Sequence, residues 1–325
     1  MRPFEYTSPK TKQQAVALLN ADAAVLAGGS DLLALMKDEV VTPKRLVNIK
    51  EIPDLHAVKS IKGETVIGSL KTLGDLAEIP GWDKHFPALY DALNEAASPQ
   101  IRNVATLGGN LCQRPRCWYF RNGMGLLPKD AKGESLVLKG DNRYHAILGN
   151  DGPAYFVSPS TIAPALIAYG ARVRLLGPNG AREVELEKFY RIPTSEGARE
   201  HDLEPNEVVT EVVIPSVEGI KSGYYEVRQK EAFDWPLAVA AVALTMNGDT
   251  VKSARVVMGQ VAPIPWVSKE AADALVGKPL NEETAMAAAN ASVAQAKSLG
   301  RNKYKITLAK VAVKRALLNA AKGGA

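Results

Sequence analysis

The chain has 325 residues, of which 46% are hydrophobic and 23% charged, a balance typical of a globular protein. Its net charge is +5, and the basic residues form no run that would indicate a nucleic-acid-binding stripe, so we expect no nucleic-acid partner. Two cysteines are too few for a disulfide scaffold or a cysteine-based zinc site. The length predicts about two domains.

The first residues, Met1 to Tyr6, lack the apolar core of a secretion signal, and no apolar stretch is long enough to cross a bilayer. We therefore expect a cytoplasmic protein without a membrane span. The mild positive charge suits anionic ligands or an acidic partner surface without requiring either.

The first 54 residues predict a small α/β lobe. Ser8 and Pro9 match a helix N-cap followed by proline at the first helical position. The elements expected after this cap are a helix with an apolar face at 15–19, a strand at 23–26, a short helix at 31–36 and a strand at 45–49.

Residues 55–217 predict a second, mixed lobe. Thr72 and Asp75 have the spacing of a capping box, so a helix should begin there. The other expected elements are a strand at 65–68, helices at 87–97 and 160–169, a hairpin at 172–176 and 183–186, and a strand at 207–215. Residues 121–141 show no period, and an irregular loop of this length indicates a role or the remnant of one.

Residues 216–221 are predicted to be a linker to a carboxy-terminal domain. The expected elements beyond it are strands at 223–229, 237–246 and 251–259, followed by Ala-rich helices at 268–276, 281–298 and 305–321. Strands followed by helices indicate an α+β domain.

Two glycine segments follow stretches predicted to be extended. They are Ala27-Gly28-Gly29-Ser30-Asp31 and Thr106-Leu107-Gly108-Gly109-Asn110. Glycine permits a positive φ and a close approach of the backbone to a ligand, and successive N–H groups in such a turn can converge on an anion. Two such turns together predict a diphosphate site. The dinucleotide fingerprint G-x-G-x-x-G and the P-loop pattern are both absent, which argues against a nicotinamide Rossmann site and a nucleoside triphosphatase.

The polar residues of these segments have different predicted roles. Ser30, Thr106 and Asn110 offer hydroxyl or amide groups to phosphate oxygens. Asp31 would repel a phosphate, so we expect it to cap the helix that follows.

Both segments resemble the two FAD-diphosphate loops in the flavin subunit of the molybdenum hydroxylases. The matching stretches are Ala27-Gly28-Gly29-Ser30-Asp31-Leu32-Leu33 and Thr106-Leu107-Gly108-Gly109-Asn110-Leu111-Cys112-Gln113. The family includes the medium subunit of aerobic carbon monoxide dehydrogenase and the flavin segment of xanthine dehydrogenase. Residues 113–121 and 145–149 are similar to the branch with the periplasmic aldehyde oxidoreductase and hydroxybenzoyl-CoA reductase flavin subunits.

The resemblance covers nearly the whole chain and implies an α+β fold. It implies a two-lobed FAD-binding domain of the vanillyl-alcohol oxidase / p-cresol methylhydroxylase type at 1–217, with lobes at about 1–54 and 55–217. A smaller α+β domain would occupy 222–325, with FAD in the cleft between the domains.

The same resemblance implies an oxidoreductase subunit that transfers electrons. Substrate would be hydroxylated at a molybdenum centre in a large partner subunit, and electrons would reach this FAD through two-iron clusters in a small one. The FAD would pass them to NAD, oxygen or another acceptor. Two alternatives stay open: a free-standing flavin oxidase or dehydrogenase of the same fold, and a flavin-free structural subunit.

Residues beyond the glycine segments are assigned by this resemblance too. Thr161 stands where relatives often have an aspartate beside the flavin, and the family's basic residue near the flavin falls at Glu226, so Arg228 or Lys230 is expected to replace it. The cofactor-binding residues expected are Ala27, Gly28, Gly29, Ser30, Asp31, Leu32, Thr106, Gly108, Gly109, Asn110, Thr161 and Lys230. No catalytic and no metal-binding residue is predicted, because no nucleophile–base set or carboxylate pair stands out.

Cys117 stands at the first cysteine position of the four-iron cluster that the similar branch carries. A cubane cluster needs four thiolates, and 122–141 contains no cysteine, so we expect no four-iron cluster. Cys112 fits a small buried side chain better than a ligand. None of the four histidines lies beside a glycine segment in the sequence, which favours non-covalent FAD, and for His145 a structural role is preferred over a flavin contact. Arg114, Arg116 and Arg121 are expected to be exposed on the electron-entry side.

Overall fold

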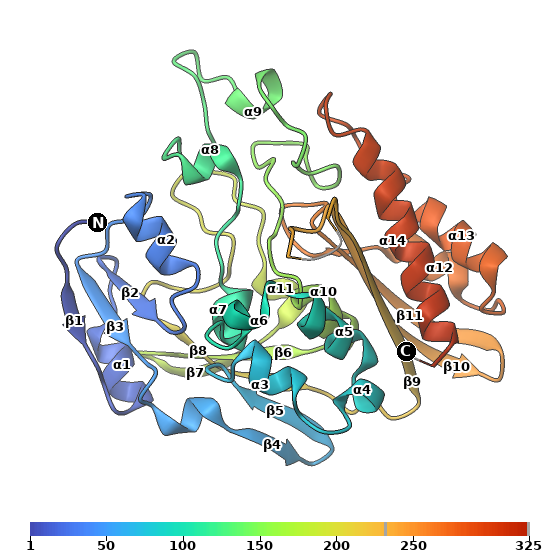
Figure 1. Ribbon diagram of the computed structural model, residues 1–325, viewed down its shortest axis with the longest axis horizontal. Helices are drawn as coiled ribbons and strands as arrows, with labels where there is room; N and C mark the ends of the chain where they lie inside the picture. The colour runs from blue at the N-terminus through green and yellow to red at the C-terminus, as the bar shows by residue number, and fades with distance from the viewer. Residues whose placement is uncertain (231–232, 324–325) are drawn as a thin grey trace.

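The computed structural model describes residues 1–230 and 233–323, and they form three β-sheets with helices packed between and around them. Figure 1 shows the amino-terminal sheet at one end of the molecule and the carboxy-terminal sheet with its helices at the other. A five-stranded sheet lies between them, below a long excursion of the chain. The mixed α+β class is the one expected from the sequence.

The amino-terminal lobe is a parallel sheet in the order β1-β3-β2. Its elements are β1 (Glu5–Thr7), α1 (Lys12–Leu18), β2 (Ala23–Leu26), α2 (Leu32–Lys37) and β3 (Arg45–Asn48). The predicted cap at Ser8 is wrong. Thr11 caps α1 by accepting from Gln14 N at 3.2 Å, whereas the Ser8 hydroxyl accepts from Asn48 Nδ2 at 3.1 Å.

The second lobe is an antiparallel sheet in the order β4-β5-β8-β6-β7. Its strands are β4 (Val58–Ile61), β5 (Glu64–Gly68), β6 (Arg172–Gly177), β7 (Gly180–Glu185) and β8 (Val208–Ile214), with a 3₁₀ turn η1 (Pro53–His56) before them. The hairpin of β6 and β7 and the strand β8 confirm the sequence predictions. Strand β4 was missed because all four of its residues are exposed, so it carries no alternation of apolar and polar side chains.

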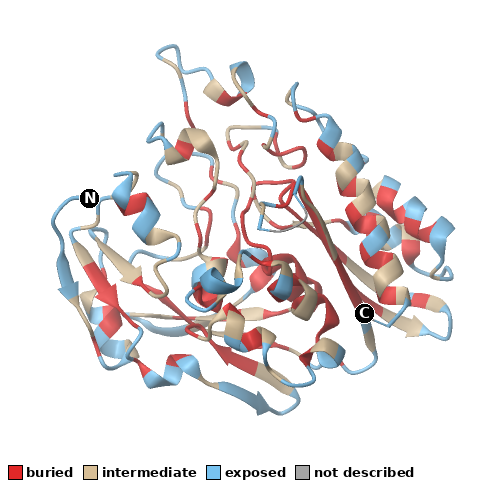
Figure 2. Cartoon of the chain, in the orientation of Figure 1, coloured by how far each residue is buried: buried red, intermediate tan, exposed pale blue. Residues whose placement is uncertain are grey.

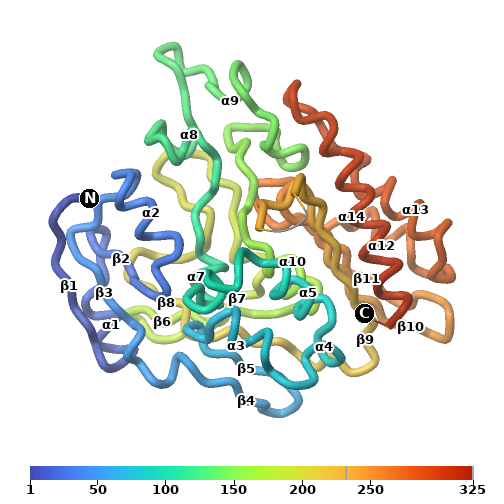
Figure 3. Tube along the Cα trace, in the orientation of Figure 1, coloured from blue at the N-terminus to red at the C-terminus, as the bar shows by residue number. Residues whose placement is uncertain are grey.

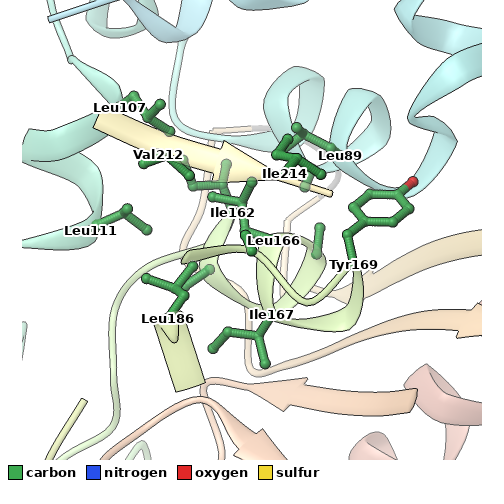
Figure 4. Packing of buried hydrophobic residues seen from close by; sticks show 14 of the residues in the cluster. Leu89, Leu107, Leu111, Ile162, Leu166, Ile167, Tyr169, Leu186, Val212 and Ile214 are labelled. Carbon is green, nitrogen blue, oxygen red and sulfur yellow. The ribbon is translucent and has the colours of Figure 1, made fainter. Parts of the chain in front are cut away.

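Short helices cover this sheet and form its core. They are α3 (Leu73–Ala77), α4 (Trp82–His85), α5 (Pro87–Glu95), α6 (Pro99–Arg102), α7 (Leu107–Leu111), α10 (Ala163–Ala168) and α11 (Leu186–Phe189). Helix α10 is buried along its whole length. Figure 4 shows Leu166 of this helix and Ile162, the residue before it, near Leu186 of α11 and Val212 of β8.

Between α7 and α10 the chain makes a long excursion, seen in Figure 3 as the green tube that rises away from the sheets. It contains α8 (Trp118–Arg121) and α9 (Leu136–Lys139). Phe120, Leu126 and Phe156 form a small core there with Leu35 of the first lobe. The carboxylate of Glu196 accepts from the amides of Leu126 and Leu127 at 2.5 and 2.9 Å. The segment predicted to be irregular is therefore held in place by packing and by hydrogen bonds.

The carboxy-terminal part is an antiparallel sheet in the order β12-β11-β10-β9. Its elements are β9 (Ile220–Val227), β10 (Ala238–Asn247), β11 (Thr250–Gly259), β12 (Trp266–Val267), α12 (Lys269–Leu275), α13 (Glu282–Ala291) and α14 (Tyr304–Ala321). Strand β9 begins inside the predicted linker. Helix α13 ends at Ala291, before the predicted residue 298. The backbone then forms turns, and Lys297 N donates to Ile147 O at 2.8 Å.

Strand β10 is buried on both faces of its sheet, as Figure 2 shows. Val239 and Ala241 pack into the core of the second lobe, and Val242 and Leu244 pack against α12, α13 and α14. This alternation follows from the two-residue period of a strand. In the described part of the chain no helix combines the length and the apolar composition needed to span a bilayer.

Candidate functional site

A cavity of about 650 Å³ lies where the amino-terminal lobe meets the second lobe. Its walls come from β2 and the segment after it, from the start of α7, and from residues 196–199 and 203–209. Both glycine segments therefore contribute to one cavity. The sequence predicted this convergence from the composition of the segments, although they are about eighty residues apart.

The first glycine segment makes a sharp turn against the second. Gly29 has φ 74°, the left-handed conformation that favours glycine. A Cβ on Gly28 would lie 1.8 Å from the carbonyl oxygen of Val104, so only glycine allows this approach of the two segments. Glycine is therefore required at position 28 for the close approach of the two segments, and favoured at position 29 by the left-handed backbone conformation.

The second glycine segment is the first turn of α7 rather than a positive-φ turn, so that expectation is wrong for Gly108 and Gly109. Thr106 caps the helix and its Oγ1 accepts from Gly109 N at 3.1 Å. Gly108 is needed for packing, because its Cβ would lie 2.9 Å from Cβ of Ser69. Thr106 determined this outcome, since a hydroxyl three residues before an amide stabilises a helix start.

The predicted capping role of Asp31 is wrong. Asp31 occupies the N-cap position of α2, but its side chain makes no capping hydrogen bond there. Its Oδ2 accepts from Arg114 N at 2.8 Å, and its Oδ1 accepts from Arg121 Nη2 at 2.7 Å and lies 3.2 Å from Arg116 Nη2. Charge-assisted bonds to two guanidinium groups are stronger than a cap to a neutral amide.

The expected exposure of Arg114, Arg116 and Arg121 is also wrong. Their side chains are 19%, 31% and 15% exposed, and they pair with Asp31 or, for Arg114, with Glu200 at 2.8 Å. These arginines fasten the segment after α7 to the first lobe. Arg114 also lines the large cavity, together with Arg199, where guanidinium groups favour an anionic ligand.

Most of the sequence-predicted site residues line the large cavity. They are Ala27, Gly28, Gly29, Ser30, Asp31, Leu32, Thr106, Gly108 and Gly109. Asn110 and Thr161 do not, although Ser160, the residue before Thr161, donates its Oγ hydrogen to Asn110 Oδ1 at 2.7 Å. Lys230 is exposed just beyond the end of β9 and does not line the cavity.

Glu226 and Arg228 form a partly buried pair away from the large cavity. Arg228 lies 3.0 Å from Glu226 and also pairs with Glu95 of α5. Burial raises the pKa of Glu226 to about 7, while the Tyr224 hydroxyl and the Arg228 charge oppose this rise. Arg228 therefore has protein partners, and which basic residue serves the flavin stays a prediction.

Cys117 and His145 lie together in the excursion between α7 and α10. The Sγ of Cys117 is 3.2 Å from Nε2 of His145. Among the described residues, no group of three or more cysteine, histidine or carboxylate side chains is arranged to hold a metal ion. His145 is only 3% exposed, and its structural role stays a prediction.

Sequence reasoning missed the wall formed by residues 196–199 and 203–209. Gly197, Arg199 and Leu203 line the cavity, and the strand β8 contributes Val208 and Val209. The local sequence carries no motif that would have marked the segment. The segment reaches the cavity only through the tertiary fold, because it leads directly into β8.

Comparison with known proteins assigns the chain. A family profile described as the FAD binding domain in molybdopterin dehydrogenase matches residues 2–217, and one described as the CO dehydrogenase flavoprotein C-terminal domain matches residues 223–320. The chain is 32% identical to the carbon monoxide dehydrogenase medium chain of Hydrogenophaga pseudoflava over 97% of this chain and 96% of that one. It is also 32% identical to the aldehyde oxidoreductase FAD-binding subunit of Escherichia coli, over 95% and 96%.

Solved structures agree with these sequence matches. A chain of the Hydrogenophaga pseudoflava carbon monoxide dehydrogenase structure superimposes with a TM-score of 0.77 at 31% identity, covering 100% of this chain and 99% of that one. A chain of quinoline 2-oxidoreductase from Pseudomonas putida 86 gives a TM-score of 0.77 at 26% identity, covering 99% and 98%. The protein therefore belongs to the family of FAD-binding medium subunits of the molybdenum hydroxylases, which are oxidoreductases.

Proposed function

We propose that the cavity of about 650 Å³ holds FAD without a covalent bond, with the diphosphate at the two glycine segments. The observation that carries this assignment is the close approach of Gly28 to the carbonyl of Val104, directly before α7. It creates a cradle of backbone between two lobes, where a side chain would obstruct both the fold and a ligand.

The residues around this cradle fit a polar, anionic ligand. Ser69 lines the cavity beside Gly108, and its buried Oγ has no hydrogen-bond partner among the described residues. Arg114 and Arg199 supply positive charge, and Ser30 and Thr106 supply hydroxyl groups. The chain's own residues would thus bind and orient the cofactor. Bound FAD would supply the chemistry of accepting electrons and passing them on.

We also propose partners, guided by the names of the relatives. One relative is called the medium chain of a dehydrogenase and another the FAD-binding subunit of an oxidoreductase, which implies further chains in those enzymes. This chain would work with a molybdenum-cofactor large subunit and a two-iron small subunit, and pass electrons to NAD, oxygen or another acceptor. The cytoplasmic location stays a prediction.

The central experiment measures flavin in the purified chain. We expect a yellow protein with about one FAD per chain, released into the supernatant when the protein is precipitated with acid. Flavin that stays with the precipitate would contradict the non-covalent bond, and a colourless, folded chain that cannot be loaded with FAD would overturn the assignment in favour of a structural subunit.

Reconstitution distinguishes an electron-transfer subunit from a free-standing oxidase. The chain alone should turn over no substrate, and adding the large and small subunits from the same operon should restore substrate-dependent bleaching of the flavin. Turnover of an organic substrate by the single chain would favour the free-standing enzyme instead.

Iron analysis tests the expected absence of a four-iron cluster. Iron and sulfide should be near zero in the isolated chain, because Cys117 has His145 rather than further thiolates beside it. About four irons per chain would contradict this prediction.

A further inference from the structure

One loop forms part of the wall of the large cavity on its solvent side. Residues 192–199, which we call the cavity loop, lie between α11 and β8, and residues 196–199 of this loop line the cavity. Thr194 and Ser195 are exposed but do not line it. The cavity loop therefore has the proposed FAD site on one side and solvent on the other.

The base of the cavity loop is closed by backbone hydrogen bonds. Arg191 N donates to Glu200 O at 2.9 Å, and Tyr190 pairs with His201 in an antiparallel bridge. Ile192 also packs against the small apolar core of the excursion. Both ends of the loop are thus fixed at one place, and a loop with this geometry can move at its tip while its base stays in position.

The tip of the cavity loop is held by one side chain, that of Glu196. Its Oε1 accepts from Leu126 N at 2.5 Å, and its Oε2 accepts from Leu127 N at 2.9 Å. In the part of the chain that the structure describes, no other hydrogen bond or ion pair joins residues 192–199 to residues outside the loop. The position of the tip therefore depends on these two charge-assisted bonds.

The excursion after α7 is shaped to receive this carboxylate. Gly125 has φ 85°, and a Cβ at this position would lie 2.6 Å from Glu196 Oε1. Glycine thus allows the left-handed turn and also leaves room for the carboxylate. The amides of Leu126 and Leu127 follow this turn and converge on one anion, as successive N–H groups of such turns can.

Arg199 brings a positive charge from the cavity loop to the cavity. The adjacent Glu200 pairs with Arg114 at 2.8 Å, and among the described residues no carboxylate forms an ion pair with Arg199. A diphosphate in the cavity would attract the Arg199 guanidinium and, with it, the loop. An anionic ligand therefore favours the closed position of the loop over an open one.

We propose that the cavity loop is a lid over the FAD cavity and that Glu196 is its latch, the side chain that keeps the lid closed. When the bonds from Leu126 N and Leu127 N to the carboxylate open, the loop swings about its base and FAD enters or leaves. Glu196 is a positioning residue here, because it acts by holding the wall in place. The use of the lid rests on the proposed function, whereas the latch contact does not.

Rates of FAD exchange test the lid on the full chain. Glu196→Gln turns one carboxylate oxygen into an NH2 donor that faces an amide donor, so the loop should open more often. We expect uptake of FAD by the FAD-free chain and release of FAD to accelerate about tenfold each, measured by stopped-flow flavin fluorescence. The dissociation constant should change less than either rate. Loss of a direct FAD contact would raise the release rate alone.

Two further variants locate the effect. Gly125→Ala places a Cβ 2.6 Å from Glu196 Oε1 and should accelerate exchange about as much, and combining it with Glu196→Gln should add little, because both break the same contact. Asp130→Asn is the matched control. Asp130 lies in the same excursion and also accepts from two backbone amides, those of Lys132 and Glu134 at 2.9 Å, but it does not line the cavity, so exchange should be unchanged.

Limited digestion with trypsin measures the latch without FAD. Cleavage after Arg199, identified by mass spectrometry, requires the loop to leave its place. It should be about tenfold faster in FAD-free Glu196→Gln than in the FAD-free wild type, and Asp130→Asn should be cleaved there at the wild-type rate. Saturating FAD should slow this cleavage in the wild type.

The outcomes separate this inference from the proposed function. Cleavage after Arg199 at the wild-type rate in folded Glu196→Gln would overturn the inference, whether or not the chain binds FAD. Faster FAD release without faster uptake would overturn it too, because Glu196 would then be a cofactor contact and not a latch. A folded chain that takes up no FAD, but is cleaved faster only in Glu196→Gln, would support the latch and contradict the FAD assignment.

Discussion

At the residue scale, the atoms around each position determine which side chain it can carry and how that side chain behaves. The four glycines of the two segments look alike in the sequence, but only Gly29 has a positive φ, and only at Gly28 would a Cβ overlap a backbone carbonyl, at 1.8 Å from Val104 O. Glu226 shows the same dependence on surroundings, because burial raises the pKa of a residue that would otherwise be an ordinary exposed carboxylate. Residue-scale predictions therefore follow from contacts rather than from residue type.

Gly28→Ala should lose most of the FAD and destabilise the chain. The new Cβ would lie 1.8 Å from Val104 O, so the two glycine segments must move apart. Flavin per chain and the unfolding temperature are the measurements. Gly63→Asn is the control, since Gly63 has φ 81°, which Asn tolerates, and nothing lies within 4 Å of its Cβ position. Full FAD occupancy in Gly28→Ala would contradict the proposed cradle.

Glu226→Gln should change how stability depends on pH. The carboxyl has an ordinary pKa of 4.5 and a folded pKa of about 7, so between these values the unfolded state has lost the proton while the native state retains it. Stability contributed by this group is therefore lost as pH rises from about 4.5 to 7. The variant lacks this loss.

The difference in free energy of unfolding, variant minus wild type, should thus increase by on the order of 2 kcal/mol across that window and then level off. Urea unfolding at several pH values measures it. Glu218→Gln, which replaces an exposed carboxylate outside this cluster, is the control. A flat difference for Glu226→Gln as well would show that the carboxyl ionises normally in the fold.

At the scale of elements, the start of α7 connects local helix chemistry to the proposed cofactor site. Thr106 caps the helix, and the same turn presents Gly108 and Gly109 to the large cavity. Thr72 caps α3 with a similar bond, from Asp75 N at 3.0 Å, but does not line that cavity. Thr72 and Thr106 therefore make the same kind of capping hydrogen bond but differ in whether they line the cavity.

Thr106→Val and Thr72→Val should each cost about 1 kcal/mol of stability, the usual effect of removing a helix cap. Only Thr106→Val should also weaken FAD binding, because its helix start belongs to the cavity wall. Unfolding in denaturant and titration of the FAD-free chain with FAD give the two numbers. Equal loss of FAD affinity in both variants would show that the effect reports stability and not the site.

At the scale of the whole molecule, one core joins the parts that the sequence separates. The predicted division at 1–217 and 222–325 stays a prediction. Val239, Ala241 and Val257 of the carboxy-terminal sheet pack in the same cluster as α5 and α10 of the preceding lobe. The Tyr169 hydroxyl of the second lobe also lies 2.6 Å from Ser222 Oγ of β9.

The full chain should therefore unfold in a single cooperative transition, and a fragment of residues 1–219 should aggregate or unfold at much lower denaturant concentration. Removing β10 and β11 would expose the apolar face of α10 that packs against them. Calorimetry of the chain and its fragment tests this. Two separate transitions in the full chain would mean that the domains are independent.

The sequence by itself determined the family, the α+β class and the convergence of two glycine segments, because these depend on local pattern and on motifs of fixed spacing. It also determined most helices and strands with strong periodicity, such as α14 and the hairpin of β6 and β7.

Tertiary structure alone decided the partners of Asp31, the burial of the three arginines and the exposed strand β4. It also decided the cavity wall at 196–209. The partners of Asp31 are distant in sequence, since Arg121 lies ninety residues away. Strand β4 has no apolar pattern of its own and is defined only by its hydrogen bonds to the neighbouring strand β5. A local pattern cannot encode which charged or hydrogen-bonding partner the fold will bring within reach.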